Sequence, residues 1–317
     1  MKRKSIYNKI LMVALFVATT TTLFSQDYSN DNPAYVIYDK EGNKVSYSHM
    51  LEKIAQSDVC LFGELHDDPI SHWLELRLVK SLYQLKGENL VVGAEMWERD
   101  NQLLLDEMQR DGYIDGPTYM ESSKLWPNTQ TDYLPILQYS KSNGIPFIAT
   151  NIPRRYARII YKKGVEYLDS LSPLAKSYLP PLPVHFNLDE SIYQIMAAPF
   201  PTDQEFEKMK EEGKTGNNPM TSGKPSNLVK AQAIKDATMA WFIKENMDKG
   251  DYFFHFNGEL HSANYTAIYY YLGYYAPELE TATISIVKTQ NVMEIDREKV
   301  GRADFVIQVP DDMIVTY

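Results

Sequence analysis

The sequence is poor in cysteine, since Cys60 is the single cysteine among 317 residues. A lone cysteine cannot form an internal disulfide, so the chain is not a disulfide-stapled secreted scaffold. A hydrophobic core has to supply the stability instead, and the chain is long enough to bury a large one. A lipid-modified export signal needs a cysteine directly after its apolar run, and Cys60 lies too deep in the chain for that role.

Positive charge is also scarce, because 32 lysines and arginines stand against 42 aspartates and glutamates, a net charge of −10. No basic run occurs beyond the first residues. This balance argues against nucleic acid and anionic membranes as partners. Long apolar runs, internal repeats and low-complexity segments are lacking as well.

The N-terminal segment has the three-part layout of a secretory signal peptide. Basic residues from Lys2 to Lys9 precede an apolar run from Ile10 to Ala18, and Ser25-Gln26 offers a cleavage point. The alternative is an uncleaved anchor, but the apolar run is shorter than the roughly 20 residues of a spanning helix. We expect a signal peptide over residues 1–25 and export of residues 26–317 to the periplasm or cell envelope, soluble after cleavage.

Short apolar segments alternate with helical patterns through most of the chain. Such continuous apolar strands are typical of a parallel sheet covered on both faces. We predict one α/β domain over residues 26–317, with a mainly parallel sheet flanked by helices. The predicted strands are 59–62, 90–94, 147–149, 252–256, 283–287 and 305–309, and the predicted helices include 69–85, 101–109 and 227–247.

The segment between the third and fourth predicted strands is too long for a single crossover. We interpret it as a smaller helical insertion at about residues 165–245. Its polar stretch from Glu211 to Ser226 is either a mobile lid or an idle surface loop.

The tetrapeptide Gly-Glu-Leu-His occurs twice, at Gly63–His66 and at Gly258–His261. Each copy follows a predicted strand, and ligands of open parallel sheets bind beyond the carboxyl ends of strands. We expect Glu64, His66, Glu259 and His261 to lie together, although each copy alone would suit a structural turn. Carboxylates and imidazoles suit acid–base work or a divalent metal, for which Glu64, His66 and His261 are the candidate ligands.

Other polar residues extend this candidate site. Glu95 ends the second predicted strand, where a buried carboxylate requires a partner or a metal. Asn151 ends the third strand, and Arg154 is either an anion clamp or a solvated helix arginine. Gln232 and Asp236 share one face of the long helix, which supports the site or a structural hydrogen-bond network.

Two further histidines have a structural interpretation. His72 lies within the first long helix, and we assign it to the surface or to packing. His255 lies inside an apolar strand and is predicted to be buried and hydrogen-bonded.

Five stretches in this order resemble the ChaN-like haem-binding (cofacial haem-binding) family. They are Leu61–Asp67, Gly93–Met96, Ala149–Arg154, Gln232–Ala240 and Gly258–His261. The resemblance implies a parallel-sheet domain with a smaller helical part. It also implies haem binding at an envelope surface, where two subunits can enclose a stacked haem pair with a tyrosine as iron ligand. The paired motifs look like those of a wider superfamily that includes erythromycin esterases and metal-dependent Tiki-type peptidases.

The sequence departs from the family in lacking the lipidated cysteine of its lipoprotein members. The haem-ligating tyrosine has no clear counterpart among 23 tyrosines. Tyr265, shortly after His261, is the candidate ligand, with His261 and Arg154 as further cofactor-binding residues; a packing role for Tyr265 is the alternative.

Three functions follow from these observations. The first is an envelope haem-binding protein in haem or iron acquisition, with a homodimer and outer-membrane transport proteins as partners. The second is a metal-dependent hydrolase, in which Glu64, His66, Glu95 and His261 act on substrate positioned by Asn151 and Arg154. The third is a non-catalytic interaction module whose tyrosines serve an interface.

Overall fold

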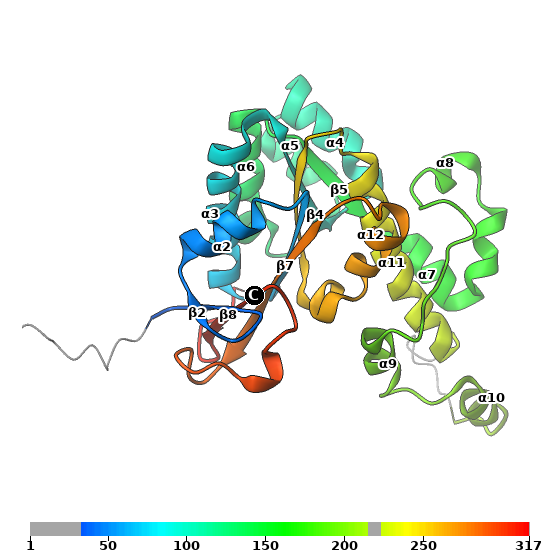
Figure 1. Ribbon diagram of the computed structural model, residues 1–317. Coiled ribbons are helices and arrows are strands. Elements are labelled where there is room, and N and C mark those ends of the chain that lie inside the picture. The colour runs from blue at the N-terminus through cyan, green and yellow to red at the C-terminus, as the bar shows by residue number, and fades with distance from the viewer. Residues whose placement is uncertain (1–32, 215–222, 317) are drawn as a thin grey trace, which may run out of the picture. The chain divides into compact units, whose positions relative to one another are not determined.

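One eight-stranded sheet organises the computed structural model (Figure 1). The structure describes residues 33–214 and 223–316, and Ala34–Tyr317 form one of the two units into which the chain divides. The predicted signal peptide over residues 1–25 lies outside the described residues. Residues 215–222, which belong to the polar stretch interpreted as a lid or a surface loop, also lie outside them.

The central strands run parallel, while β1 is antiparallel to both of its neighbours. The order across the sheet is β2 (Lys44–Val45), β1 (Val36–Asp39), β8 (Phe305–Pro310), β7 (Thr281–Thr289), β3 (Val59–Glu64), β6 (Tyr252–Gly258), β4 (Leu90–Glu98) and β5 (Phe147–Asn151). All six predicted strands are present, which confirms the predicted α/β fold with a mainly parallel sheet. The short edge strands β1 and β2 were not predicted, although Val36–Tyr38 of β1 are apolar.

Helices cover both faces of the sheet (Figure 1). The first face is covered by α2 (Tyr47–Ile54), α3 (Pro69–Lys86), α4 (Gln102–Asp106), α5 (Gly116–Ser122) and α6 (Leu134–Asn143). The helices that follow β5 and β6 are α7 (Arg154–Lys163), α8 (Pro173–Lys176), α9 (Ser191–Ala197), α10 (Asp203–Glu211), α11 (Pro225–Glu245) and α12 (Ile268–Tyr275). The predicted helices 69–85 and 227–247 correspond to α3 and α11. The predicted helix 101–109 is α4 continued by a π-helical segment, η3 (Glu107–Asp111).

Each face of the sheet has its own hydrophobic core. Cys60 and Phe62 of β3 pack into one core, and Val59 and Leu61 of the same strand pack into the other. Successive side chains of a strand point to opposite faces, so an unbroken apolar strand fills both cores. Burying each large apolar side chain contributes about 1.5–3 kcal/mol.

Among the described residues, no helix combines the length and the apolar character that crossing a membrane requires.

Candidate functional site

The two Gly-Glu-Leu-His copies lie side by side at the carboxyl ends of β3 and β6. These strands pair in parallel, with Glu64 opposite Gly258. A cavity of about 700 Å³ opens beyond them. Its lining comprises Glu64, Leu65, His66, Asp67, Met196, Gln232, Gly258, Glu259, Leu260 and His261. The structure therefore places Glu64, His66, Glu259 and His261 around one cavity.

Glu64 and His66 form a hydrogen-bonded pair at this cavity. His66 Nδ1 lies 2.6 Å from Glu64 Oε1, and the hydroxyl of Tyr133 donates to the same oxygen at 2.6 Å. Burial, and then repulsion from Glu75, raise the pKa of Glu64 well above its usual value. Burial lowers the pKa of His66, but its bond to Glu64 and the negative charge there outweigh burial and raise it.

Gly258 lets the His66 ring approach the chain of β6. A Cβ atom at position 258 would lie 2.6 Å from His66 Nε2, closer than real contacts allow. Glycine therefore permits the close approach of the ring here, and no unusual backbone angle is involved.

Glu95 lies inside β4 and not at its end, contrary to the expectation from the sequence. The strand continues to Glu98, and its pairing with β5 is irregular between Ala94 and Glu98. The backbone N–H of Gly258 donates to Glu95 Oε2 at 2.8 Å, and His261 Nε2 lies 3.2 Å from Oε1. Burial raises the pKa of Glu95, but the positive field of His261 outweighs it, and the pKa falls well below its usual value.

His261 bridges two carboxylates from different elements. It belongs to the 3₁₀ turn η7 (Glu259–His261), and its Nδ1 hydrogen-bonds to Asp236 of α11. The other oxygen of Asp236 accepts a 2.7 Å hydrogen bond from the Tyr193 hydroxyl of α9. Burial lowers the pKa of His261, but Glu95 and Asp236 together raise it to about 10. His261 is therefore an imidazolium at neutral pH, and both of its nitrogens are engaged.

These contacts join carboxylates and imidazoles into a line along the strand ends. Glu64 hydrogen-bonds to His66, and the His66 ring contacts Gly258 next to Glu95. Glu95 forms an ion pair with His261, and His261 hydrogen-bonds to Asp236 through its other nitrogen. Such groups can take up and release protons at the cavity. A doubly hydrogen-bonded His261 has no free lone pair for a metal.

The remaining cavity residues have different surroundings. Ser285 donates to Glu259 Oε1 at 2.7 Å, and Arg302 forms an ion pair with the same oxygen. Glu259 thus lines the cavity with its charge already neutralised. Gln232 also lines the cavity, and its buried Oε1 has no hydrogen-bond partner among the described residues.

Asn151 and Arg154 line a neighbouring cavity of about 340 Å³ that also includes Glu95. Asn151 Nδ2 donates to the backbone oxygen of Glu95 at 2.9 Å, which joins β5 to β4. Arg154 forms an ion pair with Glu98, and the Arg154 backbone N–H donates to Glu98 Oε2 at 2.9 Å. The Arg154 side chain is thus held at the start of α7.

Tyr265 is not among the residues that line these cavities. It belongs to the turn η8 (Ala263–Tyr265), and its hydroxyl donates to Asp304 Oδ1 at 3.3 Å. Burial, and then the charge of Asp304, raise the pKa of Tyr265. Both effects oppose the phenolate form that binds iron, so the surroundings favour the packing alternative.

Glu75 and Asp132 were not among the residues predicted from the sequence. His72, which was assigned to the surface or to packing, is buried and contacts Glu75, Glu64 and Asp132. Among the described residues, Glu64, His72 and Glu75 form a group whose ligand atoms lie within 4.8 Å of one another. The i, i+3 spacing of His72 and Glu75 was the available signal, but spacing on a helix does not tell which face meets the sheet.

His255 is buried as predicted. Thr150 Oγ1 lies 2.8 Å from its Nε2, and Asn257 Oδ1 lies 3.1 Å from its Nδ1. Burial lowers its pKa to about 4, so the ring is neutral and structural.

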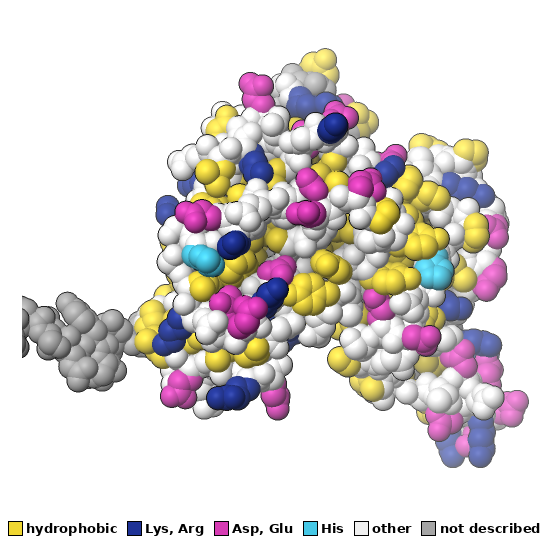
Figure 2. Space-filling view, in the orientation of Figure 1, with side chains coloured by type: hydrophobic (Ala, Val, Ile, Leu, Met, Phe, Trp, Pro, Cys, Tyr) yellow, Lys and Arg dark blue, Asp and Glu magenta, His cyan; other side chains and the backbone are white. Residues whose placement is uncertain are grey.

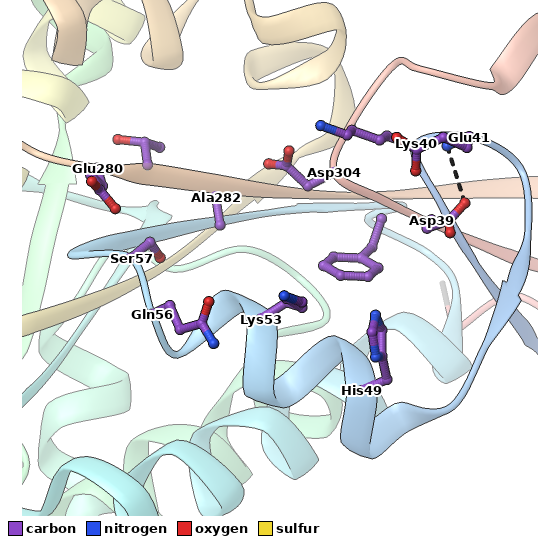
Figure 3. Close-up of a pocket in the computed structure, with 12 residues that line it drawn as sticks. Asp39, Lys40, Glu41, His49, Lys53, Gln56, Ser57, Glu280, Ala282 and Asp304 are labelled. Carbon is purple, nitrogen blue, oxygen red and sulfur yellow. Dashed lines mark hydrogen bonds between the residues drawn. The ribbon is translucent and has the colours of Figure 1, made fainter.

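A further cavity of about 450 Å³ lies at the amino ends of β3 and β7 (Figure 3). Its lining includes His49, Lys53, Ser57 and Asp304, and none of the predicted site residues. Parallel sheets bind ligands at the opposite, carboxyl edge. This cavity therefore lies at the edge of the sheet opposite to the one that carries Glu64 and His261.

Comparisons with known proteins agree with this description. The family model described as haem-binding uptake, Tiki superfamily, ChaN matches residues 50–272. No curated protein matches the chain. The structure of cofacial haem binding to ChaN of Campylobacter jejuni has 18% sequence identity and a TM-score of 0.60, covering 90% of this chain and 98% of that chain. This likeness establishes a shared fold.

Two further solved structures match the chain with lower TM-scores. A Bacillus cereus protein has 14% identity and a TM-score of 0.46, covering 84% of this chain and 92% of that chain. An erythromycin esterase mutant in its open conformation has 10% identity and a TM-score of 0.42, covering 81% of this chain and 77% of that chain.

Proposed function

The chain belongs to the ChaN family of haem-binding uptake proteins in the Tiki superfamily, and from this premise we propose that it binds haem and serves haem or iron acquisition. The match of the family model over residues 50–272 carries the proposal. The expected signal peptide supports a location in the periplasm or cell envelope. A homodimer and outer-membrane transport proteins are the partners that such a role implies.

We place the haem on an exposed aromatic surface formed by α12 and the segment before α9. Hydrophobic side chains gather over this part of the molecule (Figure 2). His185 stacks on Tyr274, with ring centroids 5.1 Å apart and planes at 12°, and Tyr274 is 53% exposed. Flat aromatic faces of this kind suit the porphyrin plane.

The iron ligand is supplied by the pair His185 and Tyr270. His185 Nε2 lies 3.0 Å from the Tyr270 hydroxyl, and His185 is exposed. Imidazole and tyrosine are both axial ligands of haem iron. His185 and Tyr270 contact each other, so ligation by one would free the other, whereas the hydroxyl of Tyr265 donates to the carboxylate of Asp304.

Haemin titration of the exported chain, residues 26–317, tests the proposal. We expect a saturable Soret shift that is weakened at least about tenfold in His185→Ala or Tyr270→Phe. Tyr167→Phe is the matched control, because Tyr167 is a partly exposed tyrosine of another segment. If haemin binding is lost in Tyr265→Phe and not in the other variants, Tyr265 is the iron ligand. Absence of saturable binding in the unmodified chain would refute haem binding.

Hydrolysis is the second candidate function, and the line of groups from Glu64 to Asp236 favours it. A hydrogen-bonded carboxyl–imidazole pair beside an open cavity is suited to general acid–base catalysis with water as nucleophile. A screen of ester and amide substrates tests this function. Activity that His66→Gln abolishes while haemin binding persists would support it, and inactivity toward all substrates would count against it.

A further inference from the structure

A buried cluster of acidic side chains lies behind the cavity, around His72 of α3. His72 Nδ1 lies 3.3 Å from Glu75 Oε2 and 3.7 Å from Glu64 Oε2. His72 Nε2 lies 3.4 Å from Asp132 Oδ2. The four residues are at most 6% exposed.

The cluster has three carboxyl groups against two histidines, His72 and His66, and His66 contacts Glu64 alone. Among the described residues, no lysine or arginine forms an ion pair with Glu64, Glu75 or Asp132, and His72 is the one imidazole that contacts all three. Buried carboxylates are costly unless they are paired or coordinate a metal.

Unpartnered oxygens point to a missing ligand in the same place. Among the described residues, no N–H or O–H group donates to the buried oxygens Glu64 Oε2 and Glu75 Oε1, and the two carboxyl groups hydrogen-bond to each other, which requires a shared proton. Each such orphaned polar atom costs about 1–3 kcal/mol, more when it is charged. A bound cation would satisfy both oxygens at once.

The orientation of His72 fits a metal ligand. Its Nε2 lies 3.1 Å from the backbone oxygen of His66, to which an N–H at that nitrogen donates. This bond leaves the lone pair of Nδ1 facing the oxygens of Glu64 and Glu75, an arrangement that is repulsive unless a proton or a cation lies between them. Metal-bound histidines are commonly held in this way, with the other ring N–H donated to a carbonyl or carboxylate.

We propose that Glu64, His72 and Glu75 bind one divalent transition-metal cation behind the cavity. Two carboxylates and one neutral imidazole form a donor set that suits Mn²⁺, Fe²⁺ or Zn²⁺. This set differs from the ligands predicted from the sequence, of which it retains Glu64 alone. The site is independent of the proposed haem surface, which shares none of its residues.

The metal would also position the cavity residues. Glu64 Oε1 accepts from Tyr133 and contacts His66, while Oε2 faces His72. A cation held at Oε2 therefore fixes the carboxylate whose other oxygen orients His66. His72 and Glu75 act as metal ligands, and they do not line the cavity.

Metal titration of the full exported chain tests the site. After treatment with a chelator, Mn²⁺ or Zn²⁺ is added alone and followed by calorimetry and thermal unfolding. We expect one equivalent to bind and to raise the Tm of the unmodified protein. Glu75→Gln and His72→Gln should each weaken binding at least about tenfold, whereas the exposed Glu52→Gln on α2 should not.

The outcomes separate a metal site from a shared proton. Failure of the unmodified chain to bind either metal would overturn the proposal, as would equal binding in a folded Glu75→Gln. A metal-independent Tm in the unmodified chain, with Glu75→Gln more stable, would assign the cluster to shared protons instead. If both ligand variants unfold, the unmodified chain and Glu52→Gln still test the site. Binding of one equivalent with a raised Tm in both proteins would support it, and absence of binding in both would overturn it.

Discussion

Glu64 lies opposite Gly258 across β3 and β6, one position out of step with Glu259 of the second tetrapeptide copy. Glu64 is the last residue of β3, whereas Glu259 lies in the 3₁₀ turn η7 that follows β6. The two glutamates of identical tetrapeptides therefore have different surroundings. Glu64 holds His66, whereas Glu259 accepts from Ser285 and pairs with Arg302.

Gly258→Ala should damage the site through the contact with His66. The added methyl group would lie 2.6 Å from His66 Nε2, so the ring must move. Overpacking of this kind costs about 1–3 kcal/mol of unfolding free energy. Urea denaturation measures the loss.

Gly273→Ala is the matched control for this substitution. Nothing lies within 4 Å of its added Cβ, and Gly273 lies within α12. Alanine should stabilise this helix by about 0.5–1 kcal/mol. Equal effects of the two substitutions would show that Gly258 does not act through His66.

His261 should remain an imidazolium at pH 8, because Glu95 and Asp236 raise its pKa to about 10. Long-range ¹⁵N NMR of the imidazole rings reports this state directly. His255 serves as the internal control, since burial lowers its pKa to about 4 and it should be neutral at pH 6. A neutral His261 at pH 8 would contradict the assignment.

The same shift predicts how stability depends on pH. The folded state holds the His261 proton more tightly than the unfolded chain, whose histidine pKa is about 6.5. Its contribution to stability is therefore complete below pH 6.5 and is lost as pH rises through about 10. His261→Gln should remove this part of the pH profile, and it should cost about 3–5 kcal/mol at pH 6 because two buried carboxylates lose their partner.

Tyr193→Phe should weaken the connection between α9 and the site. The hydroxyl donates to Asp236 at 2.7 Å, and Tyr193 is fully buried. Its removal leaves a buried carboxylate oxygen without a donor, at a cost of about 1–3 kcal/mol. Chemical denaturation should show this loss, while Tyr167→Phe, at a partly exposed position, should change stability by less than about 0.5 kcal/mol.

Glu98→Ala should destabilise α7 more than Arg154→Ala does. Glu98 accepts the Arg154 backbone N–H at the first residue of the helix, which removal of the carboxylate would leave without a partner. Loss of such a cap costs about 0.5–2 kcal/mol. The Arg154 side chain is 46% exposed, so its ion pair is worth at most about 1 kcal/mol. Thermal unfolding ranks the two variants, and the reverse order would place the stabilisation in the ion pair.

The central sheet was predictable because its strands are apolar on both faces. Side chains of Val59–Phe62 and Tyr252–Phe256 pack into both cores. The location of the two tetrapeptides at the edge of the sheet was predictable for the same reason, since each lies at the end of one of these strands. Thus the sequence determined the fold class and the edge of the sheet where the polar groups meet.

Only the tertiary structure decided which polar groups meet there. The pairing of β3 with β6 placed the His66 ring against Gly258, and the packing of α9 and α11 placed Tyr193 and Asp236 next to His261. The face that α3 turns toward the sheet buried His72 and Glu75 against Glu64. These contacts join segments far apart in the chain, and they depend on strand register and helix rotation, which local residue patterns do not specify.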